Sequence, residues 1–453
     1  MSAKAVFSTK IGLIAATVGS AIGLGNVWRF PAETQANGGA AFLLLYIGCV
    51  LLLGIPVMLA EFSIGRGGRS DAIGSFRKLA PGQPWWILGL VAVLASFLIT
   101  VFYMVVEGWT FEYLYESLFG GLFNPSAQES SLNGTFDSKM TILTHTPLEP
   151  SLFTAFVILI NICVLLGGVQ KVIERLSNIL MPLLFIILVF LAIVSLTLPG
   201  GTAGLEFFLS PDFSKLTPEV FVNALGQAFF SLSLGMGILI TYSSYYPADT
   251  KLPRTSLTVS LLSLLVAILM GFIIFPAVMT FGLDKNTLEG ATLVFVTLPE
   301  VFAHLPAPQL WSTLFFSLLF VAALTSTVSL AEVVIAMLQD RLGWTRKKAV
   351  LIALTPLFVL SILCSLSFSV LADLKIFGFS LFDFLDNFAT NILLPVVAFL
   401  TCVYLGWKAP KGFLKSELTN GGALHSKILP CIALIIRWIA PALILVIFIT
   451  QFF

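Results

Sequence analysis

The chain has 453 residues, of which 58% are hydrophobic and only 10% are charged, whereas a soluble domain carries about 25% charged residues. Its 24 Lys and Arg side chains balance 23 Asp and Glu side chains, and the formal net charge of +1 excludes a polybasic nucleic-acid binder. This much apolar surface also excludes an ordinary water-soluble core. Unbroken apolar runs of about twenty residues predict a polytopic helical membrane protein, because a β-barrel would show short alternating strands.

Apolar runs separated by Gly, Pro and charged residues predict eleven spans. They lie near 11–35, 40–65, 87–118, 151–168, 174–198, 219–245, 257–282, 310–340, 347–370, 381–406 and 428–452. With the amino terminus in the cytoplasm, eighteen Lys and Arg side chains fall on the cytoplasmic side, four outside and two in or beside the spans. Because cytoplasmic loops carry the basic excess, we expect a multi-pass protein of the cell membrane (inner or plasma) with its amino terminus inside. An odd number of spans then puts the carboxyl terminus outside.

Neither the amino-terminal segment nor the cysteines indicate a secreted, disulfide-linked protein. The segment MSAKAVFSTK lacks the regions of a cleaved signal peptide, so we expect the first span to act as its own insertion signal. The cysteines all lie inside predicted spans without a CxxC pair, which predicts small buried hydrophobes rather than a disulfide or metal site. They are Cys49, Cys163, Cys364, Cys402 and Cys431.

Two spans contain glycine clusters that do not suit an ordinary helix. Gly19, Gly23 and Gly25 lie in the first span, and Gly235 and Gly237 lie in the sixth. Each Gly costs about 1 kcal/mol of helix stability relative to Ala. Close helix packing through small residues is one explanation. However, a broken helix is tolerated in the bilayer where its backbone lines a protein cavity, and these clusters occupy corresponding places in two five-span halves. This pattern is typical of an inverted-repeat transporter with its site at the midplane.

Motifs along the whole chain resemble the neurotransmitter:sodium symporter family, and within it the bacterial eleven-span amino-acid branch (leucine-transporter-like). The motifs are GSAIGLGNVWRFP, NGGAAFLLLY, GIPVMLAEFSIGR, YMVVEGW, GQAFFSLSLGMG and VAALTSTVSL. The resemblance implies an all-α polytopic membrane protein with a leucine-transporter-like 5+5 inverted repeat plus one extra helix, and with helices 1 and 6 broken at the midplane. Residues 1–198 would form the first five-helix repeat, 219–406 the inverted second repeat, and 407–453 a cytoplasmic loop and the eleventh helix.

The resemblance also implies sodium-coupled symport of an amino acid by alternating access, and no enzymatic activity. Amine carriers of the family have an acidic residue at the position of Gly23, so a ligand here should bring its own carboxylate. Carboxylates suit the amino ends of broken helices. No charged residue falls among the matched pocket positions, which favours a neutral hydrophobic substrate, aliphatic or aromatic. The substrate-binding residues implied are Ser20, Ala21, Gly23, Gly25, Ile99, Tyr103, Phe230, Ser231, Ser233, Met236, Ser326 and Leu330.

One or two sodium ions are expected from the resemblance. The second site maps onto carbonyls and hydroxyls of Gly19, Ile22, Ala322, Thr325 and Ser326. The first site maps onto the substrate carboxylate and onto Ala21, Asn26, Ser231 and Ser263.

The first site departs from the family pattern, because relatives carry Asn or Asp at the position of Ser263. Neither Ser263 nor Ala267 supplies the carboxylate that chloride-independent relatives place at one of these positions. Either chloride binds with the help of Ser263, or this sodium site is weak, or another group supplies the charge. The chloride ligands implied are Tyr46, Gln227, Ser231 and Ser263.

Charged residues near the membrane centre are expensive and indicate function. By resemblance, Arg29 and Asp386 form an outer gate, and Lys4 and Asp340 an inner gate; for Asp340 a solvated helix end is the alternative. Glu332 lies inside the eighth span without an evident partner, and a protonation-linked role is a hypothesis for it.

Two other readings compete with a symporter. A non-transporting amino-acid sensor on the same fold is the main alternative. A membrane-embedded enzyme is the other, but nothing in the sequence supplies a nucleophile–base pair, a metal cluster or a phosphate loop. The expected partners are the amino-acid substrate and the lipid bilayer, with no nucleic acid, and the sequence does not predict the oligomeric state.

Overall fold

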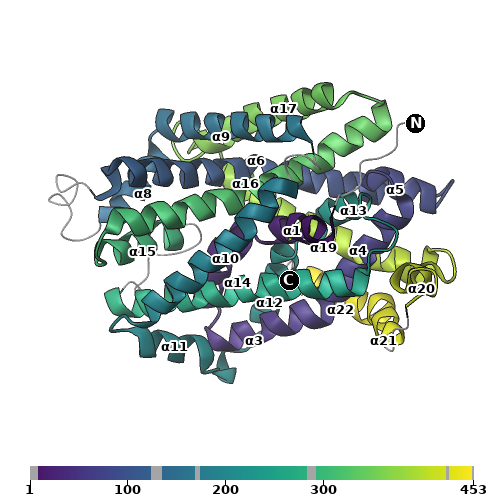
Figure 1. Ribbon diagram of the computed structural model, residues 1–453, viewed down its shortest axis with the longest axis horizontal. Coiled ribbons are helices and arrows are strands. Elements are labelled where there is room, and N and C mark those ends of the chain that lie inside the picture. Colours follow the sequence, from purple (N-terminus) through teal and green to yellow (C-terminus); the bar gives the residue numbers. More distant parts are fainter. Residues whose placement is uncertain (1–8, 124–134, 169–173, 283–291, 425–427, 451–453) are drawn as a thin grey trace.

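The computed structural model describes residues 9–123, 135–168, 174–282, 292–424 and 428–450. Within these ranges every regular element is a helix, apart from one isolated bridge between Ile376 and Phe379. Helices of the two chain halves run side by side along the long axis of the molecule (Figure 1). The predicted all-α class is confirmed.

Nine of the described helices are long and apolar enough to cross a membrane. They are α3–η2–α4 (Ala40–Gly68), α6 (Trp86–Phe119), α9 (Leu148–Gly167), α10 (Glu174–Leu196, apolar over Ser177–Leu196), α14 (Leu252–Phe281), α16 (Pro308–Leu342), α17 (Arg346–Leu366), α18–η6–α19–η7 (Leu381–Lys408) and α21–η8–α22 (Leu429–Thr450). Shorter helices connect them: α5 (Ala72–Leu79), α8 (Thr135–His145), α11 (Gly201–Leu209), α15 (Thr292–Ala303) and α20 (Phe413–Thr419).

The first predicted span is a broken helix. Its first half, α1 (Lys10–Ala21), ends where Ile22 leaves helical geometry with φ −92° and ψ 87°. The chain resumes as a π-helix, η1 (Gly25–Arg29), and continues as α2 (Phe30–Ala36). The two halves are bent by 50° and together pass as a tenth span. The break predicted from the glycine cluster is therefore confirmed.

The sixth predicted span is broken more severely. It consists of α12 (Pro218–Ser231) and α13 (Ile238–Ser243), which has only six residues. Between them Ser233, Gly235 and Gly237 have φ of +55°, +78° and +71°, a region that favours glycine. Because of this break, neither half is long enough to count as a span, so the described helices give nine or ten spans by length where the sequence predicts eleven.

The broken helices lie inside a shell of continuous ones. The most apolar stretch of α16 is 89% buried and that of α6 is 72% buried, whereas the last span is only 29% buried. In Figure 1, α6 and α16 lie side by side, α9 and α17 cover one flank, and α3 and α11 lie at the opposite side. Cys163 on α9 and Cys431 on the last span, both predicted to be buried, are exposed, because these two spans are the least buried of those described. The repeat boundaries and the side on which each terminus lies stay predictions.

Candidate substrate and sodium site

A small pocket lies where the two breaks meet. Eleven of the twelve predicted substrate residues line it, and so does Ile238, the first residue of α13, which the sequence did not suggest. The lining is Ser20, Ala21, Gly23, Gly25, Ile99, Tyr103, Phe230, Ser233, Met236, Ile238, Ser326 and Leu330. Ser231 does not line the pocket, because its hydroxyl faces Tyr46 at 2.9 Å. The pocket lining contains no charged side chain.

One end of the pocket is polar and is built on the unwound backbone. The Tyr103 hydroxyl faces the backbone of Leu24 and Gly25 and the hydroxyl of Ser326. A Cβ atom placed on Gly23 would lie 2.7 Å from the Tyr103 hydroxyl and 3.1 Å from Cβ of Ser326. Glycine at this position therefore keeps open the space between the unwound backbone and these hydroxyls.

The two breaks are fastened to each other and to a third helix. The Ser233 hydroxyl donates to the Ser20 carbonyl at 2.7 Å, which links the sixth span to the first. Glu61 on α4 accepts a hydrogen bond from the Gly235 backbone at 2.7 Å, and its side chain is fully buried. A buried carboxylate thus satisfies a backbone N–H that the helix break leaves free.

The residues of the predicted second sodium site come together behind the first break. Thr325 Oγ1 lies 3.0 Å from the carbonyl oxygens of both Gly19 and Ala322, and Ser326 Oγ lies 3.5 Å from the Gly19 oxygen. Ile22 follows the last residue of α1, where helix carbonyls lack partners. Neutral oxygens of this kind are the ligands that hard cations prefer, so the donor set fits Na⁺.

The residues of the predicted first sodium site form one hydrogen-bonded chain. The Asn26 amide donates to the Ala21 carbonyl at 2.8 Å and to Ser263 Oγ at 3.1 Å, and Ser263 donates to the Ser231 carbonyl at 3.2 Å. All four predicted protein ligands are therefore neighbours. None of these four residues has a charged side chain.

The predicted chloride residues lie on the far side of the same chain. The Tyr46 hydroxyl contacts Ser231 and Ser263, whereas the Gln227 amide donates to the Gly25 carbonyl at 2.8 Å. The Gln227 side-chain oxygen is buried and has no hydrogen-bond partner among the described residues. Ala267, one turn after Ser263, is fully buried and supplies no polar group.

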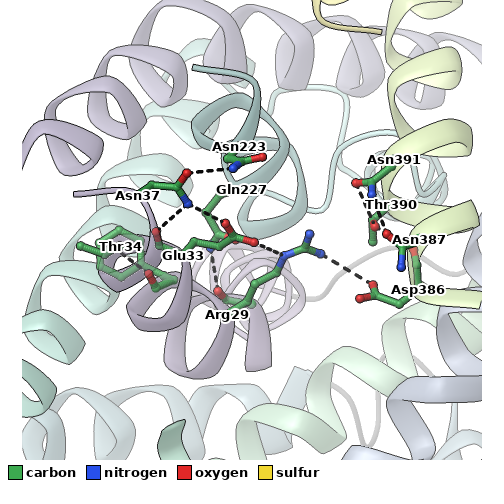
Figure 2. Close-up of polar contacts among 12 residues, drawn as sticks. Arg29, Glu33, Thr34, Asn37, Asn223, Gln227, Asp386, Asn387, Thr390 and Asn391 are labelled. Carbon is green, nitrogen blue, oxygen red and sulfur yellow. Dashed lines mark hydrogen bonds and ion pairs between the residues drawn. The ribbon is translucent and has the colours of Figure 1, made fainter. Parts of the chain in front are cut away.

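The residues predicted to form the outer gate, Arg29 and Asp386, lie next to a wall of the pocket. Arg29 Nη1 is 3.7 Å from Asp386 Oδ1, which joins η1 to α18 (Leu381–Asn387) (Figure 2). The Arg29 guanidinium also lies 4.9 Å from the centre of the Phe230 ring, a wall of the pocket. Such a cation–π contact couples the gate to the pocket wall.

At the inner end the structure differs in part from the sequence hypotheses. Lys4 lies outside the described residues, so its pairing with Asp340 stays a prediction. Asp340 accepts a hydrogen bond from the Asp71 backbone at 2.8 Å. Glu332 does have a partner, because Arg346 Nη2 lies 2.7 Å from its Oε2 atom. The sequence missed Arg346 because it lies fourteen residues away at the start of the next helix.

Comparisons with known proteins identify the family and the fold. The model of the sodium:neurotransmitter symporter family matches residues 4–141 and 139–453. An uncharacterized sodium-dependent transporter of Bacillus subtilis, YhdH, is 37% identical over 98% of this chain and 96% of its own length. A similarly described Haemophilus influenzae protein is 37% identical over 99% and 98%.

The crystal structure of MhsT in complex with L-phenylalanine superposes with a TM-score of 0.92 at 42% identity, and 99% of each chain is covered. The protein is therefore a multi-pass membrane protein of the leucine-transporter-like fold. These matches show that the chain belongs to the sodium:neurotransmitter symporter family, whose members are transporters rather than enzymes.

Proposed function

We propose that the protein carries neutral hydrophobic amino acids, aliphatic or aromatic, across the cell membrane by sodium-coupled symport and alternating access. The observation that supports this most is the pocket, which has a polar end of unwound backbone and hydroxyls and an apolar remainder without a charged side chain. An amino acid has the same division, with charged main-chain groups at one end. A charged side chain would be costly to bury in such a pocket.

The polar end would receive the amino-acid main chain. The Tyr103 hydroxyl and the backbone near Gly23 and Gly25 would bind the carboxylate, because unwound helix ends expose N–H groups. The walls formed by Ile99, Phe230 and their apolar neighbours would contact the side chain. That MhsT binds L-phenylalanine in a similar structure supports an aromatic substrate.

Two sodium ions would couple transport to the gradient. The site around Thr325 would hold one ion through neutral oxygens alone. The site around Asn26 and Ser263 would hold the other, with the substrate carboxylate as the charged ligand. Because the substrate carboxylate would contact this sodium ion directly, binding of either one would raise the affinity for the other, and sodium and substrate would bind cooperatively. Chloride near Tyr46 and Ser263 would balance the remaining charge.

The test is uptake of labelled leucine, phenylalanine and tryptophan into proteoliposomes with an inward sodium gradient. Uptake that collapses when potassium or choline replaces sodium would support symport, and competition among the three would rank substrates. Sodium-dependent binding without accumulation would favour a non-transporting sensor. The proposal would be overturned if the protein neither bound nor took up any of the three amino acids.

A further inference from the structure

Arg29 of the outer gate lies between two carboxylates. Its Nε atom is 3.6 Å from Glu33 Oε1, and its Nη1 atom is 3.7 Å from Asp386 Oδ1 (Figure 2). Both distances exceed the 2.7–3.2 Å typical of an N–H···O hydrogen bond. The guanidinium is therefore shared between the two carboxylates and is not committed to either.

The two carboxylates belong to different parts of the structure. Glu33 lies one turn after Arg29 on the continuation of the same half-span, α2, so it moves with Arg29. Asp386 lies on α18, so in the proposed alternating-access cycle it would separate from Arg29 when the outer gate opens. The Arg29–Glu33 contact is then present in both states, whereas the Arg29–Asp386 contact exists only in the closed state.

Glu33 is held in place from behind. Asn37 donates to Glu33 Oε2 at 3.1 Å, and Asn223 on α12 donates to the Asn37 side-chain oxygen at 2.8 Å (Figure 2). Glu33 Oε1 is left to face Arg29. This amide chain joins the outer halves of the two broken spans and fixes the carboxylate near the gate.

We infer that Glu33 is a positioning residue that weakens the closed outer gate and keeps Arg29 paired when the gate opens. Two effects act in the same direction. In the closed state Glu33 and Asp386 carry like charges on the same guanidinium and repel each other. In the open state Glu33 approaches Arg29 without competition. The side chains of Arg29, Glu33 and Asp386 are 20%, 25% and 29% exposed, so water screens these interactions only partly. The inference rests on the proposed transport function.

The decisive variant is Glu33→Gln, which keeps the shape and removes the charge. We expect a firmer closed gate, so labelled L-phenylalanine should dissociate to the outside about two- to fivefold more slowly, which corresponds to ~0.4–1 kcal/mol. The kcat of uptake should fall while KM falls or stays level. Glu300→Gln is the matched control, because Glu300 also faces a basic side chain four residues on, His304, away from the gate.

A double variant tests whether Glu33 acts by competing with Asp386 for Arg29. Asp386→Asn removes the partner with which Glu33 competes, so adding Glu33→Gln to it should no longer slow dissociation. If Glu33 instead only supports Arg29, Glu33→Gln will speed dissociation, and the inference is wrong. Unchanged dissociation in the single variant contradicts it equally.

Hydrogen exchange separates this inference from the transport proposal, because it needs no substrate. Amides of α18 and of η6 (Phe388–Leu393) should exchange more slowly in Glu33→Gln than in the unmodified protein. A protein that neither binds nor transports phenylalanine, yet shows this change, would overturn the proposed substrate and leave the gate inference supported. Equal or faster exchange would overturn the gate inference.

Discussion

Glu332 and Arg346 form a two-point ion pair inside the helical bundle. Nη2 of Arg346 lies 2.7 Å from Oε2 of Glu332, and Nη1 lies 3.1 Å from Oε1. The Tyr245 hydroxyl donates to the same Oε1 atom at 3.2 Å, and Arg346 Nε donates to the Leu165 carbonyl at 2.6 Å. The pair therefore ties α16, α17 and α9 to the segment that follows α13. The geometry supports a structural role at this position more than the proton exchange that the sequence suggested.

Removing one partner of this pair should destabilise the protein. Glu332 is fully buried and the Arg346 side chain is only 22% exposed. Glu332→Ala would therefore leave the Arg346 guanidinium largely buried and without its carboxylate partner. We expect a loss of ~3 kcal/mol in stability, near the lower limit for a buried pair. The measurement is the melting temperature in detergent. The double variant Glu332→Gln/Arg346→Gln should melt above Glu332→Ala, and a double variant that is less stable still would contradict this account.

Gly23→Ala should abolish most amino-acid binding without unfolding the protein. The added methyl group would lie 2.7 Å from the Tyr103 hydroxyl and would fill the polar end of the pocket. We expect at least a tenfold weaker affinity, the equivalent of ~1.4 kcal/mol, in equilibrium binding of labelled phenylalanine. Gly226→Ala on α12 is the matched control, because a Cβ there meets nothing within 4 Å. Equal binding by the two variants would place the ligand elsewhere.

Thr325→Val should weaken sodium activation and leave the fold intact. The change keeps the shape of the side chain but removes the hydroxyl that lies 3.0 Å from the Gly19 and Ala322 carbonyls. We expect the sodium concentration for half-maximal uptake to rise about tenfold, because losing a ligand costs on the order of 1–2 kcal/mol. Thr355→Val, on the exposed face of α17, provides the comparison. A normal sodium response in Thr325→Val would remove Thr325 from the proposed site.

Uptake should depend on chloride, and Ser263→Asp should remove that dependence. The first sodium site, around Asn26, Ser231 and Ser263, contains no acidic group, so we expect chloride to supply the balancing negative charge. Replacing chloride with gluconate should lower uptake by the unmodified protein severalfold and leave uptake by Ser263→Asp unchanged. Full uptake in gluconate, together with coupling to a single sodium ion, would indicate that the first sodium site is weak.

Much of the fold could be predicted because its signals are local. Glycine clusters predicted both helix breaks, and the positive φ of Gly235 and Gly237 explains the second one physically. The lengths of the two halves of the sixth span were less predictable, because the sequence does not show that α13 has only six residues after the break. A hydropathy pattern gives the length of an apolar segment, but it does not show at which residue the backbone leaves helical geometry.

Most residues of the candidate site could be predicted from motifs. The differences between the predicted and the observed pocket lining arise from the direction in which side chains point. Ser231 belongs to the matched motif, yet its hydroxyl points to Tyr46 and not into the pocket. Ile238 has no polar or glycine signal, so only its place at the start of α13 brings it to the lining. Arg346 was not predicted as the partner of Glu332, because contacts between helices are not visible in a linear sequence.

The two residues predicted to form the outer gate adjoin segments of π-helix. Arg29 is the last residue of η1, and Asp386 precedes η6 by two positions. A π-turn holds more residues per hydrogen-bonded loop than an α-turn, and each residue turns a helix by about 100°. Rewinding a single such segment by one residue would swing a charged side chain to another face of its helix. The outer end of this transporter thus has spare backbone length for turning a gate residue aside, without carrying an entire helix through the lipid.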